Sequence, residues 1–139
     1  MPISYDIQLR PTIEKRVFTG FGMVALDVRQ PTKTIALNVN AVAISSAKLR
    51  GANGQGEQTA GIAIDAKEQV ATLTFPKEIA PGAWQLALDF SGTINQSGQG
   101  LFYATYQEET TGAKKTMLGT QMEPADARRL FPCWDEPSF

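Results

Sequence analysis

The sequence predicts an all-β fold: a twisted antiparallel sheet or β-sandwich of about eight or nine strands, with one short helix near the C-terminus. Three observations favour this class. Apolar residues recur at every second position through most of the chain, which is the period of a half-buried strand. Glycines and prolines separate these runs at roughly ten-residue spacing. Only one stretch, close to the C-terminus, has a composition that suits a helix.

Strict alternation defines the first two strands. Every second residue of 3–9 is large and apolar or aromatic, so a strand is predicted there, and Pro11 is expected to end it. The second strand is predicted at 18–28 by the same pattern. It contains Gly20 and Gly22, which indicate a bulge or a bend.

Seven further strands are predicted, five from the same alternation, one from an apolar and aromatic run at 101–106, and one that follows a hairpin turn at 111–114. Turns rich in glycine or proline separate most of them, and the pair Pro81–Gly82 marks one such turn. Pro76 is expected to close the strand that precedes this turn. The predicted ranges are 35–39, 42–44, 62–64, 71–75, 84–90, 101–106 and 115–122.

A single helix of about two turns is predicted at 124–130. Pro124 suits the first helical position, because its missing N–H would be unpaired there in any case. Asp126 lies near the start, where a negative charge complements the helix dipole. Pro132 then stops the helix.

A polar, glycine-rich stretch at 51–56 has two interpretations. The first is a hairpin connection between strands, and the second is a loop that binds phosphate. The spacing of its glycines is not G-x-G-x-x-G, and no helical pattern beginning with Lys-Ser/Thr follows. The sequence therefore favours the hairpin connection.

Composition is typical of one ordinary globular domain. The 139 residues are 42% hydrophobic and 19% charged, and 13 basic residues nearly balance 14 acidic ones. Neither Lys nor Arg forms a run, so no nucleic-acid partner is expected. The sequence contains no stretch of about 18 apolar residues, so no membrane span is predicted. No signal peptide is visible either, which leaves the cytoplasm, the periplasm and secretion all open.

The counts of histidine and cysteine exclude several kinds of site within these residues. The chain has no histidine, and Cys133 is its only cysteine. A His-rich zinc site and a Ser–His–Asp arrangement are both excluded. One cysteine cannot form an internal disulfide. Because no histidine can activate the thiol, we interpret Cys133 as a small buried apolar group rather than as a nucleophile.

Two stretches near the C-terminus are not generic for a β-sandwich. Residues 120–124 read Thr-Gln-Met-Glu-Pro, and residues 127–137 read Ala-Arg-Arg-Leu-Phe-Pro-Cys-Trp-Asp-Glu-Pro. Together they closely resemble a segment of the aminopeptidase N-like zinc metallopeptidases, the gluzincins that carry an H-E-x-x-H motif. The rest of the chain resembles the family more loosely, from the opening strand at 5–11 to Gly100-Leu101-Phe102.

The resemblance implies a role for two polar residues. The family removes one residue from the free N-terminus of a peptide, so it must recognise an ammonium group. By resemblance, Glu123 is the carboxylate that binds this ammonium, and Gln121 lines the pocket for the first side chain. The residues alone favour a solvated acid at a strand end for Glu123, and only the resemblance favours the binding role. The resemblance implies no catalytic and no metal-binding residue in this chain, and it assigns the Zn²⁺ to the full-length enzyme.

Five residues around this motif are interpreted as structural. They are Pro124, Arg128, Arg129, Asp135 and Glu136. Two arginines followed by an acidic turn predict a bidentate ion-pair network that pins the turn to the sheet. We also hypothesise a cis peptide bond between Glu123 and Pro124, which would re-aim the end of the strand.

By resemblance, residues 1–139 are expected to be the N-terminal β-domain of an aminopeptidase, incomplete at its C-terminal end and inactive alone. Its expected partners are the peptide N-terminus and the remainder of its own polypeptide. An uncovered strand edge is expected to cause self-association. The alternative is an autonomous β-sandwich module for binding or interaction, with exposed aromatics such as Trp84, Tyr103 and Tyr106. The alternation of Trp84 with Leu86 favours the core over a binding platform.

Overall fold

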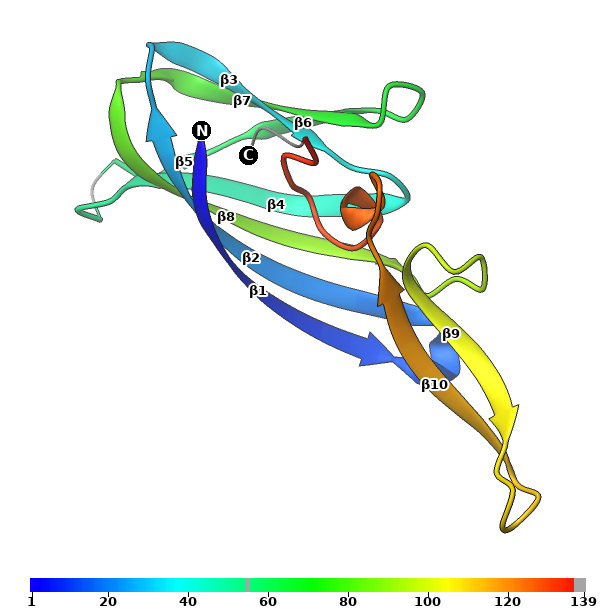
Figure 1. Ribbon diagram of the computed structural model, residues 1–139. Coiled ribbons are helices and arrows are strands. Elements are labelled where there is room, and N and C mark those ends of the chain that lie inside the picture. Colours follow the sequence, from blue (N-terminus) through cyan, green and yellow to red (C-terminus); the bar gives the residue numbers. More distant parts are fainter. Residues whose placement is uncertain (55, 137–139) are drawn as a thin grey trace.

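The computed structural model describes residues 1–54 and 56–136, and nearly all of its regular structure is strand (Figure 1). The all-β prediction is therefore confirmed. The described part of the chain contains ten strands and two three-residue 3₁₀ turns, so it has more strands than the sequence predicted. The strands are β1 (Pro2–Thr12), β2 (Val17–Val28), β3 (Thr32–Asn38), β4 (Val42–Gly51), β5 (Gln58–Thr59), β6 (Gly61–Asp65), β7 (Val70–Ile79), β8 (Gly82–Thr93), β9 (Gly100–Gln107) and β10 (Lys114–Gln121), and the turns are η1 (Ile13–Lys15) and η2 (Ala127–Arg129).

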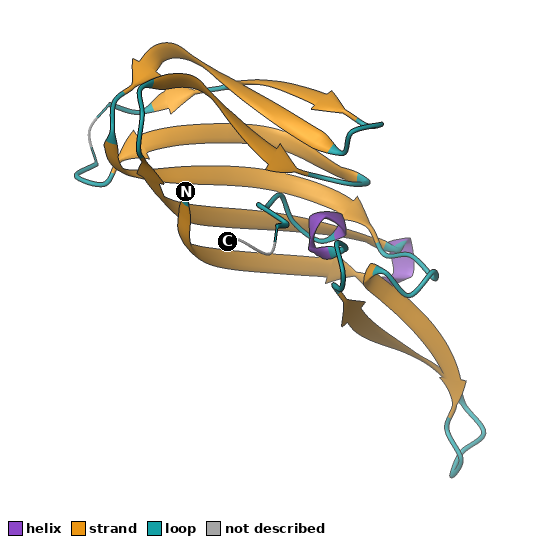
Figure 2. Cartoon of the chain, turned by 45° about the horizontal axis from the view of Figure 1, so that its top comes forward, coloured by secondary structure: helices purple, strands orange, loops and turns teal. Residues whose placement is uncertain are grey.

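Two antiparallel sheets form a sandwich. The larger has the strand order β1-β2-β8-β4-β5, and the smaller has the order β3-β7-β6. Figures 1 and 2 show the smaller sheet lying over one face of the larger one. Strands β9 and β10 form a separate hairpin that extends away from the sandwich. Strands β1–β8 form the sandwich, and the hairpin follows them in the sequence. The chain after the hairpin returns to the sandwich.

The core lies between the two sheets. Side chains at alternate positions of β2, β4 and β8 meet those of β3 and β7, as the period of a strand requires. Burial of these apolar side chains is the main favourable contribution to folding. The largest fully buried residues are Phe18, Phe75, Leu37, Leu49, Leu73, Ile79, Leu86, Leu88, Val24, Val39 and Pro132.

Glycines in the larger sheet make room for phenylalanine rings. Gly20 is paired with Phe90, and Gly92 is paired with Phe18, across β2 and β8. A Cβ atom built on Gly20 would lie 2.3 Å from the Phe90 ring, and one on Gly92 would lie 2.5 Å from the Phe18 ring. The pairing of β2 runs through Gly20 and Gly22 without a register shift, so the predicted bulge is wrong. Gly20 and Gly92 instead leave room for the Phe90 and Phe18 rings that pack against them.

Gly20→Ala is expected to lower the free energy of unfolding by about 1–3 kcal/mol, because the added methyl overlaps the buried Phe90 ring. Urea denaturation followed by circular dichroism measures this change. Gly61→Ala is the matched control, since the nearest atom to its Cβ is 3.8 Å away. Equal midpoints for the two variants would contradict the packing argument.

A bulge explains why the fourth strand was predicted too short. β4 runs to Gly51, whereas the sequence predicted 42–44. The register with β8 shifts between Ile44 and Ser46, so the inward-facing residues change from even to odd positions. Ala47 and Leu49 are both fully buried after this shift. A search for strict alternation ends at such a point, because a shift of one residue exchanges the two faces.

Two prolines lie inside strands that they were expected to end. β1 continues through Pro11, and it is an edge strand, where a missing N–H costs no interior ladder bond. β7 continues through Pro76 to Ile79, at a place where the pairing with β3 is irregular. The two-residue strand β5 was not predicted, because two residues carry no periodicity.

The predicted helix at 124–130 is wrong. The chain forms a turn over 123–126 and then only the single 3₁₀ turn η2. Within it, Leu130 N–H donates to the carbonyl of Ala127 at 2.9 Å. Pro132 has no N–H to extend the turn. The carbonyl of Arg128 accepts a hydrogen bond from a neighbouring segment instead, so the backbone is paired without a longer helix.

Candidate functional site

The C-terminal segment (122–136) closes one end of the sandwich. Its backbone pairs with β3, where the N–H of Asn38 donates to the carbonyl of Cys133 at 2.7 Å and the N–H of Cys133 donates back at 3.2 Å. The N–H of Asn40 donates to the carbonyl of Arg128 at 2.9 Å. The side-chain oxygen of Asn38 also accepts the N–H of Asp135 at 3.1 Å. The segment is therefore held as an added edge of the smaller sheet.

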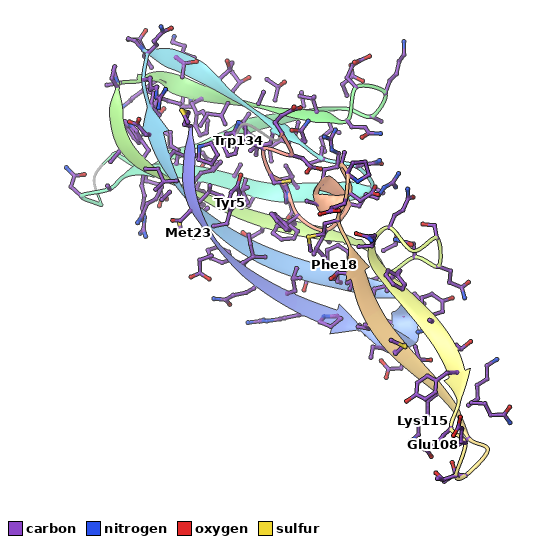
Figure 3. All side chains as sticks on the ribbon, in the orientation of Figure 1. Tyr5, Phe18, Met23, Glu108, Lys115 and Trp134 are labelled. Carbon is purple, nitrogen blue, oxygen red and sulfur yellow. The ribbon has the colours of Figure 1, made fainter. Side chains whose placement is uncertain are left out.

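Apolar contacts fix the other side of the C-terminal segment to β1. The rings of Tyr5 and Phe131 meet edge to face, with centroids 5.9 Å apart. The hydroxyl of Tyr5 accepts the N–H of Trp134 at 3.1 Å, and Figure 3 shows these two residues close together. Leu130 and Cys133 are each 3% exposed. The segment thus contacts both sheets, through β3 of the smaller one and β1 of the larger one.

Gln121 and Glu123 lie where the hairpin meets this segment. Gln121 is the last residue of β10, and both side chains are exposed. The backbone N–H of Glu123 donates to Oε1 of Gln121 at 3.2 Å. The peptide bond between Glu123 and Pro124 is cis, as hypothesised. The structure therefore places the two predicted binding residues side by side on the surface.

The two arginines of the C-terminal segment form ion pairs with nearby aspartates. The guanidinium of Arg128 lies 2.9 Å from Asp135, and both side chains are nearly buried, at 13% and 12% exposure. The guanidinium of Arg129 lies 2.7 Å from Asp126. The Glu123 carboxylate has no ion pair or hydrogen bond with any residue in 1–54 or 56–136. It is thus a surface anion without a counter-charge of its own.

The predicted ion-pair network is divided between two pairs. Arg128 also donates to the carbonyl of Asp135 at 3.1 Å, which makes this contact two-pronged. Arg129 contacts Asp126, which the sequence assigned to the start of a helix. Glu136 is exposed and joins neither pair among the residues that the structure describes. Pro137, the last residue of the predicted motif, lies outside the described residues.

A glycine brings the hairpin against the 3₁₀ turn η2. Gly100 is paired with Gln121 and has a φ of 59°. A Cβ atom on Gly100 would lie 2.6 Å from the Cβ of Arg129, so only glycine permits this approach. Sequence reasoning missed this contact and those of Asn38. The position of Asn38, a polar residue at the end of an apolar strand, was the one sequence feature that could have indicated its contacts with the C-terminal segment.

Burial makes Cys133 unreactive. Desolvation, together with the nearby Asp135 carboxylate, raises the pKa of its thiol to about 12. The thiol therefore stays protonated at neutral pH, and a protonated thiol is a poor nucleophile. Cys133 is buried, as interpreted from the sequence.

The three aromatic residues of the alternative module do not share one surface. Trp84 packs against the core and donates its indole N–H to the carbonyl of Ala80 at 2.9 Å. Tyr103 lies under the guanidinium of Arg16, 3.8 Å from the centre of the ring. Tyr106 is three positions along β9, so it projects from the opposite face of the hairpin. No common binding platform results.

Residues 1–54 and 56–136 contain no group of three or more His, Cys, Asp and Glu side chains that is placed to hold a metal ion. None of their helical segments has the length and hydropathy needed to cross a membrane.

Comparison with known proteins gives a family match over the entire chain. The family described as the Peptidase M1 N-terminal domain matches residues 1–139. Aminopeptidase M1-C of Oryza sativa subsp. japonica is 38% identical over 138 residues, which are 99% of this chain and 15% of that protein. Aminopeptidase N of Acetobacter pasteurianus is 38% identical over 139 residues, which are 100% of this chain and 38% of that protein.

A yeast relative gives the same result. "Aminopeptidase 2, mitochondrial" of Saccharomyces cerevisiae is 36% identical over 144 residues, which are 100% of this chain and 14% of that protein. The chain therefore spans only about one seventh of the length of the rice and yeast proteins. The resemblance inferred from the motifs at 120–124 and 127–137 is confirmed. This chain belongs to the Peptidase M1 N-terminal domain family.

Proposed function

We propose that this chain is the N-terminal, substrate-anchoring domain of a zinc-dependent aminopeptidase that removes N-terminal residues from peptides. The observation that carries the proposal is the exposed Glu123 carboxylate, which has no counter-charge among the described residues although two arginines lie in the same segment. The family match and the names of the relatives, all aminopeptidases, support it.

Glu123 binds the ammonium group of the substrate in this proposal. A carboxylate and an ammonium form a charge-assisted hydrogen bond, which is shorter and stronger than a neutral one. Arg128 and Arg129 do not compete for the carboxylate, because Asp135 and Asp126 engage them. Gln121 has its carbonyl oxygen occupied by the N–H of Glu123. Its NH₂ group is therefore the part that faces the first side chain of the substrate.

The structural role proposed for the surrounding residues is to hold Glu123 in place. Arg128 and Asp135 tie η2 to the last described residues of the C-terminal segment, and Arg129 ties η2 to Asp126. Pro124 sets the path of the chain immediately after Glu123. Glu136 is proposed as a further member of this group on the strength of the motif alone.

The residues of this chain do not fit a zinc site. The chain has no histidine, its one cysteine is buried with a raised thiol pKa, and the described residues bring no three metal ligands together. In the proposed enzyme the metal is held by residues outside this chain. Zinc held there would supply the Lewis acid for peptide hydrolysis. The task of this chain is to bind and orient the peptide N-terminus.

The proposed partners are the peptide N-terminus and the remainder of the same polypeptide. Several large apolar side chains are exposed on the hairpin and on the sandwich, namely Ile3 at 66%, Met117 at 51%, Tyr106 at 48% and Ile64 at 45%. Tyr106 and Met117 project from the same face of the hairpin, and an exposed apolar patch there suits a surface that a larger assembly covers. The hairpin is the clearest case, because a two-stranded ribbon is marginally stable alone.

The chain alone is expected to show no turnover of aminoacyl amide substrates, with or without added zinc, because it lacks the donors that a catalytic zinc requires. A fluorogenic aminoacyl amide measures this directly. The Glu123→Ala chain, purified in parallel, controls for contaminating peptidases. Turnover that the wild-type chain shows and the variant loses would contradict the proposal.

A further inference from the structure

Strand β1 forms one edge of the larger sheet, and no other strand of residues 1–54 and 56–136 pairs with its outer side. β1 is 11 residues long and stands last in the strand order, paired only with β2 among the described strands. Figure 1 shows its outer side open along its length. Such an edge presents a row of N–H and C=O groups to solvent, and it is a template for another strand. The side chains that border this edge decide which strand fits it.

Two opposite charges lie on the same face of β1. Asp6 and Arg10 are four positions apart, so both project from the outer face of the sheet, and both are exposed. Neither forms an ion pair or hydrogen bond with a described residue. Their neighbours across the sheet on β2 are Met23 and Thr19, which carry no charge. Gln8 lies midway between the two charges.

We propose that the free edge of β1 pairs with the same edge of a second copy of this chain, antiparallel and about a two-fold axis at Gln8. A two-fold axis repeats each contact, so residue i of one copy faces residue j of the other, and j faces i. A strand pairs well with its own copy only when the side chains at equal distances on either side of the axis are complementary. In this register each Asp6 faces the Arg10 of the second copy. The facing pairs are Ser4 with Thr12, Tyr5 with Pro11, Asp6 with Arg10, Ile7 with Leu9, and Gln8 with Gln8.

The charges select this register over the adjacent ones. An axis at Ile7 would set Arg10 against Ser4 and leave both charges unmatched. An axis at Leu9 would set Asp6 against Thr12, with the same result. An axis at Asp6 would bring two like charges together, which destabilises a strand pair. Only the axis at Gln8 brings two opposite-charge pairs together while Ile7 meets Leu9 on the inner face.

Sedimentation equilibrium of the 139-residue chain tests the proposal. We expect a monomer–dimer equilibrium, and Asp6→Arg or Arg10→Asp is expected to raise the dimer Kd about tenfold or more, because each change turns two attractive pairs into two repulsive ones. The double variant D6R/R10D restores the opposite-charge pairs, so its Kd is expected to return to within about threefold of the wild-type value. The control Glu109→Arg reverses a charge at the exposed tip of the hairpin and is expected to leave the Kd unchanged.

Mixing the two single variants separates register from folding. An equimolar mixture of Asp6→Arg and Arg10→Asp chains brings opposite charges together again, so we expect heterodimers from two chains that dimerise poorly alone. Hydrogen exchange is expected to slow at the amides of β1 in the dimer. A chain that stays monomeric at millimolar concentration overturns the proposal. A dimer whose Kd is the same in both single variants, or a mixture that forms no heterodimer, also overturns it.

Discussion

In the aminopeptidase proposed above, Glu123→Ala is expected to lower kcat/KM for peptides with a free N-terminus by about 100-fold. The substitution removes a charge-assisted hydrogen bond worth about 1.5–3 kcal/mol, and each 1.4 kcal/mol is a factor of ten. Glu123 has no described ion-pair partner, so its loss leaves no unpaired charge within the domain. The measurement is steady-state kinetics on an aminoacyl amide, with stability checked by urea denaturation.

Two further variants separate charge from shape. Glu123→Gln keeps an acceptor at the same place but removes the charge, and its kcat/KM is expected to fall between those of the wild type and Glu123→Ala. Glu109→Ala removes an exposed carboxylate from the tip of the hairpin, and it is expected to leave kcat/KM unchanged. If Glu123→Ala lowers kcat/KM no more than Glu109→Ala does, Glu123 is not the residue that binds the ammonium.

Arg128→Ala is expected to lower the free energy of unfolding of the 139-residue chain by about 3 kcal/mol. It leaves the Asp135 carboxylate, which is only 12% exposed, without its guanidinium partner. The Asp135 carboxylate also accepts the backbone N–H of Arg128 at 3.2 Å, so that bond still joins the two residues in the variant. The shift of the urea midpoint measures the loss.

An exposed ion pair serves as the control for this measurement. Lys48 and Glu57 lie 3.7 Å apart with side chains at 50% and 56% exposure. Pairs of this kind contribute little, so Lys48→Ala is expected to change the free energy of unfolding by about 0.5 kcal/mol or less. A similar midpoint for Lys48→Ala and Arg128→Ala would show that burial of the Arg128–Asp135 pair adds no stability.

The fold class was predictable because a strand buried on one face has apolar residues at every second position of the sequence. That signal found the centre of most strands. It failed at Ser45, where one extra residue in β4 exchanges the faces, and at Pro11, where an edge strand tolerates a residue that an inner strand excludes. In the predicted helix, the carbonyl of Arg128 accepts the N–H of Asn40, which lies just after β3, instead of an N–H of the next helical turn.

The candidate site was predictable only in part. Gln121 and Glu123 were identified from a family motif, and their adjacency follows from the strand end that carries them. The partner of Arg129 was not identified, because the choice between Asp126 and the later acids depends on how the turn folds. The approach of Gly100 to Arg129 joins two elements that no local pattern connects.

The contact between Tyr5 and Trp134 links residues 129 positions apart. During synthesis the chain emerges from its N-terminus, so the sheets can assemble before the residues that close the sandwich exist. Contacts between residues so distant in sequence raise the contact order, and they are the slowest to form because a long loop must first be ordered. The contacts that hold the segment carrying Glu123 against β1 are therefore expected to form after the two sheets.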